Sequence, residues 1–315
     1  MTAPSQDVLG EPYVASTLRL APDEEGEAVA TLVHRPAPAP THRAVLHVHG
    51  FCDYFFQTPA AEYWVSRGYD FYALDLRKYG RSLLPHQTPN YTADLRVYAE
   101  ELSLAYEQIS RNHDQVVLSA HSTGGLTVPL WAAEHRVPAS AFVLNAPWLD
   151  MHGSTLTRTL LMPAIQRLGA VQPRRLVPRD VDGLYGRSLH RDFDGEWDYD
   201  LAWKPLESWP VFAGWVRAVR LAHRRLTHGL ELDQPVLVLS SSRSSHPTSM
   251  RDPDVHRTDV VLDVEQIRRR APLLGRHVTV DQVVGARHDV TLSLPEVRCR
   301  VFDRIDRFLA AYVER

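Results

Sequence analysis

A serine at position 122 lies where a buried strand is predicted to run directly into a helix. The stretch reads Val117-Leu118-Ser119-Ala120-His121-Ser122-Thr123-Gly124-Gly125. A sharp strand-to-helix turn holds its serine in strained backbone geometry and points the hydroxyl out of the sheet. Such a turn needs small residues two positions before and after the serine, and Ala120 and Gly124 meet this need. Ala120 stands where the usual Gly-x-Ser-x-Gly pattern has glycine, and Ser122 is the candidate nucleophile.

His288 is the candidate base for this serine. A serine hydroxyl is a weak nucleophile near neutral pH, so it needs a base, and the base needs an acid that orients it. On a turn of this kind the order along the chain is serine, acid, histidine. His288 follows the last predicted strand, at the carboxyl end where sites of open α/β sheets gather. His121, beside the serine, is expected to pack beneath the turn.

Asp259 is the preferred acid among several candidates. The acid should follow the strand predicted at residues 235–239, and four aspartates come after that strand: Asp252, Asp254, Asp259 and Asp263. We prefer Asp259 because it directly precedes a helical segment and leaves room before His288 for one helix and one strand. The alternative is that Asp259 merely caps that helix. If Asp259 is the acid, residues 242–257 form an extra polar loop.

Two backbone amides could stabilise the oxyanion that acyl transfer creates. The Thr123 amide lies at the start of a predicted helix, where amide hydrogens are free and the helix dipole is positive. The second donor should come from the loop after Val48, and the Phe51 amide fits. Gly50 would let this backbone approach the substrate, although a simple glycine turn is the alternative.

The elements that must position these residues alternate between strand and helix. Short apolar runs typical of buried parallel strands occur at residues 44–48, 69–74, 115–120, 141–145 and 235–239. Helical spacing occurs at residues 59–67, 92–110 and 124–135. A β-hairpin is expected earlier, at residues 14–20 and 28–34, and a helix, a strand and a helix later, at 264–270, 277–283 and 296–313. We predict an α/β fold whose mostly parallel sheet has helices on both faces.

The alternation stops after residue 145, and the next strand is predicted only at residue 235. We predict a core of residues 1–145 and 233–315, and a helical cap of residues 146–232 inserted before the acid. The cap holds five of the seven tryptophans, which suits an aromatic-lined pocket. The helical spacing beyond Pro210 gives an apolar stripe that could face an acyl group or could simply pack on the core. Trp215, Phe212 and Trp148 are the candidate substrate-binding residues.

The composition excludes several function classes. The 315 residues are 44% hydrophobic and 23% charged, as in ordinary globular proteins. A net charge of −3 is too balanced for a nucleic-acid binder. We expect no transmembrane segment and no secretory leader. Cys52 and Cys299 are too few for a disulfide framework, which favours the cytoplasm. The residues show neither a phosphate loop nor a metal cluster, so we expect no cofactor and no metal.

Several of these stretches resemble the α/β-hydrolase superfamily, and within it the monoacylglycerol lipase and lysophospholipase-like branch, which includes serine aminopeptidases. The resemblance covers nearly the whole chain after residue 40. It rests on an oxyanion loop at residues 49–54, a second-strand signature at 68–82, the nucleophile turn at 120–125 and a histidine loop at 285–289. Tyr79, where a small residue or histidine is frequent, and the polar insertion before Asp259 depart from the family pattern.

We therefore expect a cytoplasmic serine hydrolase that cleaves a small ester or lipid with an apolar acyl group. Ser122 would attack the carbonyl, His288 would relay the proton, and water would release the acyl-enzyme. A serine aminopeptidase is one alternative, and it would need an acidic anchor such as Glu196 or Asp198. A ligand-binding receptor with a vestigial triad is the other. The sequence leaves the acyl length and the oligomeric state open.

Overall fold

The computed structural model describes residues 1–151, 162–178 and 182–314. A nine-stranded sheet runs through its centre in the order β1-β2-β3-β5-β4-β6-β7-β8-β9. The strands are β1 (Ser5–Gln6), β2 (Val14–Asp23), β3 (Gly26–Arg35), β4 (Arg43–Val48), β5 (Asp70–Asp75), β6 (Gln115–His121), β7 (Ala141–Asn145), β8 (Val236–Ser241) and β9 (Val278–Val283). From β5 to β9 all neighbouring strands are parallel. The predicted mostly parallel sheet is confirmed.

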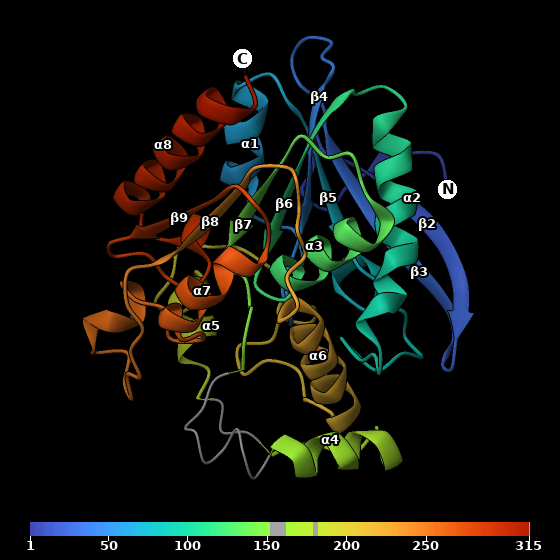
Figure 1. Cartoon of the computed structure of the whole chain (residues 1–315), viewed down its shortest axis with the longest axis vertical. Coiled ribbons are helices and arrows are strands. Elements are labelled where there is room, and N and C mark those ends of the chain that lie inside the picture. The colour runs from blue at the N-terminus through green and yellow to red at the C-terminus, as the bar shows by residue number, and fades with distance from the viewer. Residues whose placement is uncertain (152–161, 179–181, 315) are drawn as a thin grey trace.

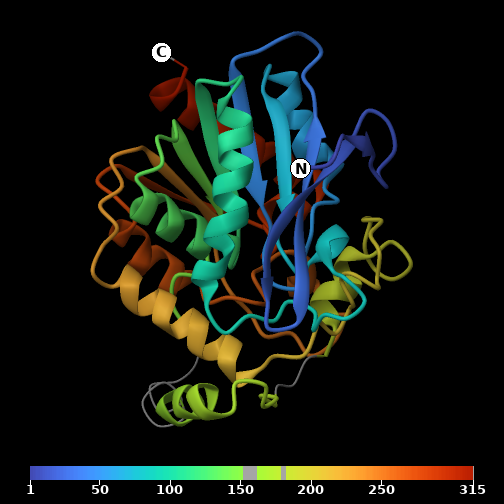
Figure 2. The ribbon, with the colours of Figure 1, turned by 90° about the vertical axis from the view of Figure 1, so that its right-hand side faces the viewer.

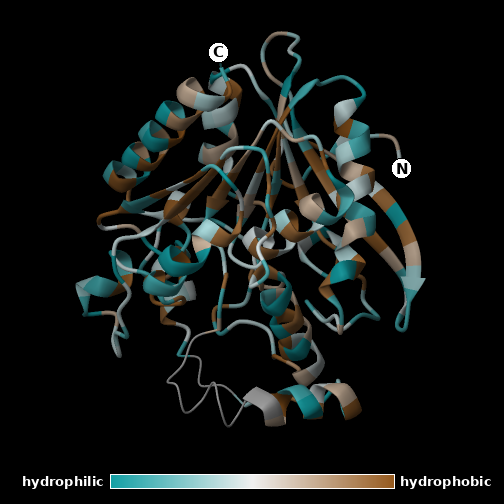
Figure 3. Cartoon of the chain, viewed as in Figure 1, coloured by the Kyte–Doolittle hydropathy of each residue, from teal (hydrophilic) through white to brown (hydrophobic). Residues whose placement is uncertain are grey.

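Helices cover both faces of this sheet (Figures 1 and 2). The core helices are α1 (Thr58–Ser66), α2 (Ala99–Ser110), α3 (Gly124–His135), α7 (Val264–Arg270) and α8 (Pro295–Tyr312). Successive strand residues point to opposite faces, so Val117 packs with α1 and α8 whereas Leu118 packs with α2 and α3. Both faces of each central strand are therefore apolar, and the strands lie between two hydrophobic layers (Figure 3).

The antiparallel edge comes from the predicted hairpin. β2 and β3 pair antiparallel, and β3 then pairs antiparallel with β5, which joins the hairpin to the parallel strands. Lys78 fastens the hairpin turn to the core, because its Nζ lies 2.6 Å from an Asp23 carboxylate oxygen and 2.5 Å from one of Glu25. Lys78 is buried in this contact.

One predicted helix begins later than its sequence pattern indicates. We expected helix from residue 92, but α2 begins at Ala99 and a short 3-10 turn, Leu95–Tyr98, precedes it. The Asp94 carboxylate accepts a hydrogen bond from the Arg96 amide and caps that turn. A local side-chain hydrogen bond thus replaces the first helical turn that the apolar spacing predicted.

The segment between β7 and β8 forms helices in its described part. These are α4 (Met162–Val171), α5 (Leu184–Leu189) and α6 (Ala213–Leu226). In both views α4 and α6 lie beyond the carboxyl ends of β6 and β7 (Figures 1 and 2). α4 packs closely on α6, since a Cβ on Gly169 would lie 2.3 Å from the Ala213 carbonyl oxygen. Among the residues that the structure describes, no helix has the length and apolar character to cross a membrane.

Candidate active site

Ser122 occupies a strained turn between β6 and α3. Its φ of 51° lies in the left-handed region, which residues with a side chain rarely adopt. Two backbone hydrogen bonds hold it there: Ser122 N–H donates to the Asn145 carbonyl at 3.0 Å, and Trp148 N–H donates to the Ser122 carbonyl at 2.9 Å. A Cβ at Gly124 would lie 2.5 Å from the His49 carbonyl oxygen, so this position of the turn requires glycine.

Ser122, His288 and Asp259 form one hydrogen-bonded chain. His288 Nε2 lies 3.1 Å from Ser122 Oγ, and His288 Nδ1 lies 2.9 Å from Asp259 Oδ2. All three residues are buried, and Asp259 has no exposed surface. A carboxylate at Nδ1 favours the tautomer whose Nε2 is free to accept the serine proton. The arrangement can therefore convert the serine hydroxyl into a nucleophile.

The electrostatics of Asp259 keep it ionised. Burial raises the pKa of this carboxyl group, but the His288 ring and the Leu262 and Val261 amides favour the charged form more strongly. These amides donate to Asp259 Oδ1 at 2.7 and 2.8 Å. The net effect holds the pKa of Asp259 below its ordinary value. The carboxylate is thus available to stabilise an imidazolium on His288.

The predicted extra loop carries Asp259 back to the end of β8. Asp259 N–H donates to the Arg243 carbonyl, and Ser245 N–H donates to the Asp259 carbonyl, each at 3.1 Å. Ser244 and Asp259 therefore lie side by side in a parallel bridge. Residues 246–258 loop away from the end of β8 and return to it, so Asp259 lies close to β8.

The other candidate aspartates serve local structure. Asp254 pairs with Arg243 at 2.7 Å on the surface of the loop. Asp252 caps the short 3-10 turn Pro253–His256 through the Asp254 amide. Asp263, rather than Asp259, caps α7 through the Glu265 amide at 3.0 Å. The alternative in which Asp259 serves only as the helix cap is therefore excluded.

The two amides considered as oxyanion donors border Ser122. Thr123 is the N-terminal cap position of α3. The turn with Phe51 passes directly beside the serine, since a Cβ on Gly50 would lie 2.9 Å from Ser122 Cβ. Within the described residues, neither the Thr123 nor the Phe51 amide donates a hydrogen bond. Both N–H groups are thus available to an oxygen atom bound at Ser122.

An aromatic cluster adjoins this turn. The Phe51 and Trp215 rings are 4.3 Å apart, and the Trp215 and Trp148 rings are 5.7 Å apart. Phe212 is separate from this cluster, because its ring packs edge-on against Tyr91 at 5.3 Å. Two of the three predicted substrate-binding side chains therefore lie with Phe51, and the third contacts another part of the fold.

Sequence reasoning missed a polar network behind His288. Asp289 is buried and accepts hydrogen bonds from Asn145 Nδ2 and Thr291 Oγ1, both at 2.6 Å. The Tyr185 hydroxyl accepts from the Asp289 amide at 3.2 Å, and its ring lies 5.9 Å from that of His288. The adjacency of Asp289 to His288 was the one available signal. The network fixes the backbone directly after the histidine.

Three buried side chains of this region have the geometry to share a cation. One ligand atom each from Asp53, His121 and Asp289 lies within 4.8 Å of the others. Protein groups already contact all three side chains: the Lys204 ammonium lies 2.8 Å from Asp53, Asn145 Nδ2 donates to Asp289, and His121 Nδ1 lies 3.1 Å from the Asn145 carbonyl oxygen. The fixed positive charge here is thus a lysine side chain of the protein itself. Sequence reasoning also missed the contact between Lys204 and Asp53.

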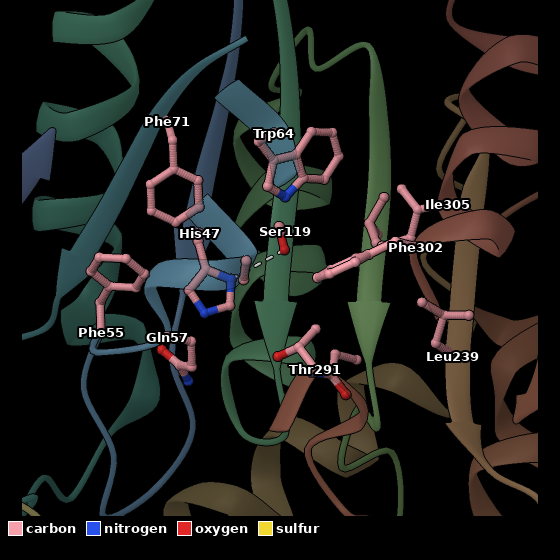
Figure 4. Close-up of a pocket in the computed structure, with 13 residues that line it drawn as sticks. His47, Phe55, Gln57, Trp64, Phe71, Ser119, Leu239, Thr291, Phe302 and Ile305 are labelled. Atoms are coloured by element: carbon pink, nitrogen blue, oxygen red, sulfur yellow. Dashed lines mark hydrogen bonds between the residues drawn. The ribbon is translucent and has the colours of Figure 1, made fainter. Parts of the chain in front are cut away.

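A small cavity lies between the sheet and the helices α1 and α8 (Figure 4). Its volume is about 20 Å³, and it is lined by side chains of strands β4 to β8, of α1 and α8, and of the adjoining loops. His47 Nδ1 lies 3.1 Å from Ser119 Oγ across it. Burial lowers the pKa of His47 to about 4, so this ring is neutral at neutral pH.

The chain matches a known family over more than half of its length. Residues 39–243 match the model of the family described as serine aminopeptidase, S33. This match spans the Phe51 turn and the Ser122 turn. No curated protein was found to match the sequence.

Solved structures share the fold at low identity. A soluble variant of the Saccharomyces cerevisiae monoglyceride lipase, in complex with a substrate analog, has a TM-score of 0.69 at 15% identity, with 99% of this chain and 96% of that chain covered. The Paleococcus ferrophilus monoacylglycerol lipase has a TM-score of 0.65 at 20% identity, with 89% and 99% covered. Est1E from Butyrivibrio proteoclasticus with bound ferulic acid has a TM-score of 0.56 at 15% identity, with 95% and 100% covered.

Proposed function

The chain belongs to the hydrolase family described as serine aminopeptidase, S33, and from this premise we propose that it is a serine hydrolase cleaving carboxylic esters with an apolar acyl group. The observation that carries the proposal is the hydrogen-bonded chain from Ser122 through His288 to Asp259. Candidate substrates are simple esters, lysophospholipids and monoacylglycerols. We chose these substrates by analogy with the two lipases and Est1E, which share the fold.

The reaction proceeds through an acyl-enzyme. Ser122 Oγ bonds to the ester carbonyl carbon while His288 Nε2 takes its proton, and the carbonyl oxygen becomes an oxyanion facing the Phe51 and Thr123 amides. Collapse of this intermediate breaks the bond to the alcohol oxygen, which receives the proton from His288. Water then attacks the acyl-enzyme with His288 as base, and Ser122 is regenerated.

The aromatic cluster supports an apolar acyl group. Trp215 comes from α6 and Phe51 from the turn beside Ser122. An acyl chain that is attached to Ser122 and extends toward them would contact aromatic side chains rather than charged ones. We assign Trp215 and Trp148 to the acyl-binding site. We no longer assign Phe212 to substrate binding, because its ring packs against Tyr91. Residues 146–232 would then act as the cap, or lid, over the core formed by residues 1–145 and 233–315.

The aminopeptidase alternative gains no support from its candidate anchors. Glu196 pairs with Arg298 at 2.9 Å, and Asp198 pairs with Arg191 at 2.8 Å. Both carboxylates are at least 40% exposed, so neither is reserved for a substrate ammonium. The receptor alternative is disfavoured by the complete hydrogen-bonded chain at Ser122. The free thiols of Cys52 and Cys299 support our proposal of a cytoplasmic location.

Two measurements test the proposed function. A fluorophosphonate probe should label the wild-type protein on Ser122, and p-nitrophenyl esters should turn over faster than aminoacyl p-nitroanilides. Labelling with faster anilide cleavage would make the protein a peptidase. Failure of both labelling and turnover would make it a binding protein.

A further inference from the structure

The turn that carries Phe51 is held from outside by two distant side chains. Cys52, the next residue, has a φ of 52°, a left-handed conformation that a residue with a side chain keeps only when its surroundings enforce it. Its N–H donates to Asn90 Oδ1 at 3.1 Å, and its carbonyl accepts from Lys204 Nζ at 3.3 Å. Both backbone polar groups of the strained residue are therefore fixed by side chains from elsewhere in the chain.

Lys204 also fixes the end of the same turn. Its Nζ lies 2.8 Å from Asp53 Oδ1, while Asp53 Oδ2 accepts the Gly50 N–H at 3.4 Å. The ammonium group lies 5.8 Å from the centres of the Phe56 and Tyr199 rings. Lys204 and Asp53 are 8% and 2% exposed. A buried ammonium with a single carboxylate partner has little freedom to move, so it defines where that carboxylate and the turn must lie.

This contact joins two parts of the fold. Lys204 belongs to the segment between β7 and β8, whereas Gly50, Cys52 and Asp53 belong to the turn after β4. The Trp215 ring against Phe51 joins the same two parts from the apolar side. The position of the Phe51 N–H therefore depends on residues that the family's nucleophile and histidine motifs do not contain.

We propose that Lys204 is a positioning residue for the oxyanion: it holds the Cys52 carbonyl and the Asp53 carboxylate so that the Phe51 N–H faces the carbonyl oxygen of an ester at Ser122. This inference rests on the proposed function. An oxyanion donor acts when negative charge develops, so its displacement lowers kcat more than it raises KM. Loss of a whole donor costs about 10²–10³ in kcat, and a displaced donor should cost about 10- to 100-fold.

The test compares Lys204→Met with Lys78→Met. Both changes remove a buried ammonium from carboxylate partners, but Lys78 pairs with the β2–β3 hairpin. We expect Lys204→Met to lower kcat for p-nitrophenyl butyrate about 10- to 100-fold with KM changed by less than about threefold. Lys78→Met should lower Tm and leave kcat within about twofold.

A transition-state probe separates positioning from general weakening. 1,1,1-Trifluorododecan-2-one forms a hemiketal when Ser122 Oγ bonds to its carbonyl carbon, and its oxygen then takes the place of the oxyanion. Its affinity should fall in Lys204→Met by the same factor as kcat/KM. A kcat loss without this fall in affinity, a KM effect alone, or equal kcat losses in both lysine variants would each refute the positioning role.

A second variant covers the case in which Lys204→Met does not fold. The double variant Lys204→Met with Asp53→Asn removes both charges, so no buried carboxylate is left unpaired, but it also removes the bond to the Cys52 carbonyl. It should show the same kcat loss, and a folded double variant with wild-type kcat would overturn the inference. Wild-type turnover with Ser122 labelling secures the proposed function independently, and an inactive wild type would overturn both.

Discussion

Asp259 lies beside Ser244 in a parallel β-bridge, although residues 245–258 separate them along the chain. The acid is thus built onto the continuation of β8, and the polar loop projects from that point without displacing it. The side chain at Asp259 accepts two backbone amides on one oxygen and the His288 ring on the other. The same carboxylate therefore both organises the local backbone and contacts the ring of His288.

Replacing Asp259 with asparagine should lower kcat by about 10⁴, as the same change does in Ser-His-Asp proteases, because an amide no longer favours the reactive tautomer of His288. Asp254→Asn and Asp263→Asn are controls, since these carboxylates serve the loop and the α7 cap. The measurement is ester turnover together with Tm. If either control variant lost more kcat than Asp259→Asn, the acid would be that residue and not Asp259.

Replacing Ser122 with alanine should abolish ester turnover and fluorophosphonate labelling, with a loss of at least about 10³-fold. The fold should remain, because only one hydroxyl is removed and no sizeable cavity forms. Thermal melting checks the fold beside the kinetics. Turnover near the wild-type rate in Ser122→Ala would remove this serine from the mechanism.

A small change should be costly at Gly124 and mild at Ala120. Gly124→Ala places a methyl group 2.5 Å from the His49 carbonyl oxygen and 2.7 Å from that of Val48. We expect about 1–3 kcal/mol of lost stability from this overpacking, together with reduced kcat from a shifted Ser122 turn. Ala120→Gly restores the usual motif and should cost at most about 1 kcal/mol with activity retained. Chemical denaturation and ester kinetics on both variants decide this, and a tolerated Gly124→Ala would refute the steric account.

Trp215→Ala should shift the acyl-length optimum upward. Each buried methylene contributes about 0.8 kcal/mol, or roughly fourfold in kcat/KM, until the pocket is full. A C2 to C16 series of p-nitrophenyl esters measures the optimum. Because Trp215 is 5% exposed, Tm should also fall, with a cost of about 3–5 kcal/mol.

Trp64→Ala is the matched control for this change. Trp64 is 4% exposed and lies on α1, with the hydrophobic layer on the other face of the sheet. It should lower Tm and leave the optimum in place. A flat wild-type profile, or an optimum unmoved by Trp215→Ala, would remove the aromatic cluster from substrate recognition.

His47 should make the fold sensitive to acid. Its folded pKa is about 4, against an ordinary value of 6.5, so the unfolded chain binds a proton that the folded chain does not. This binding leaves stability unaffected above pH 6.5 and lowers it progressively as pH falls toward 4, by about 1.4 kcal/mol per pKa unit at most. His47→Gln should flatten the stability profile between pH 6.5 and 4.5. Exposed His228→Gln should not, and equal slopes for wild type and His47→Gln would contradict the assignment.

The sequence predicted what local chemistry dictates. A small-residue turn between strand and helix pointed to Ser122, the position after the last strand pointed to His288, and the structure brings these two side chains within 3.1 Å of each other. Both follow from rules that need no long-range information. The strand and helix order was predictable for the same reason, because alternating apolar periods describe each element separately.

Contacts between distant segments were beyond the sequence. Nothing in the spacing of Asp252, Asp254, Asp259 and Asp263 reveals that the loop closes at Ser244 and returns only one of them to His288. Phe212 belongs to the same apolar stripe as Trp215, yet the two side chains pack on different neighbours. Lys204 was invisible because its partner Asp53 is far away in the chain and a lone lysine carries no motif.

Both lysines of this chain, Lys78 and Lys204, are buried in ion pairs. Amine-directed reagents such as N-hydroxysuccinimide esters therefore meet no exposed lysine side chain on the folded protein. Coupling, cross-linking or modification through a lysine side chain would therefore require the fold to open. Slow acquisition of lysine label would consequently report opening of the fold, and the label on Lys204 would report release of the turn beside the nucleophile.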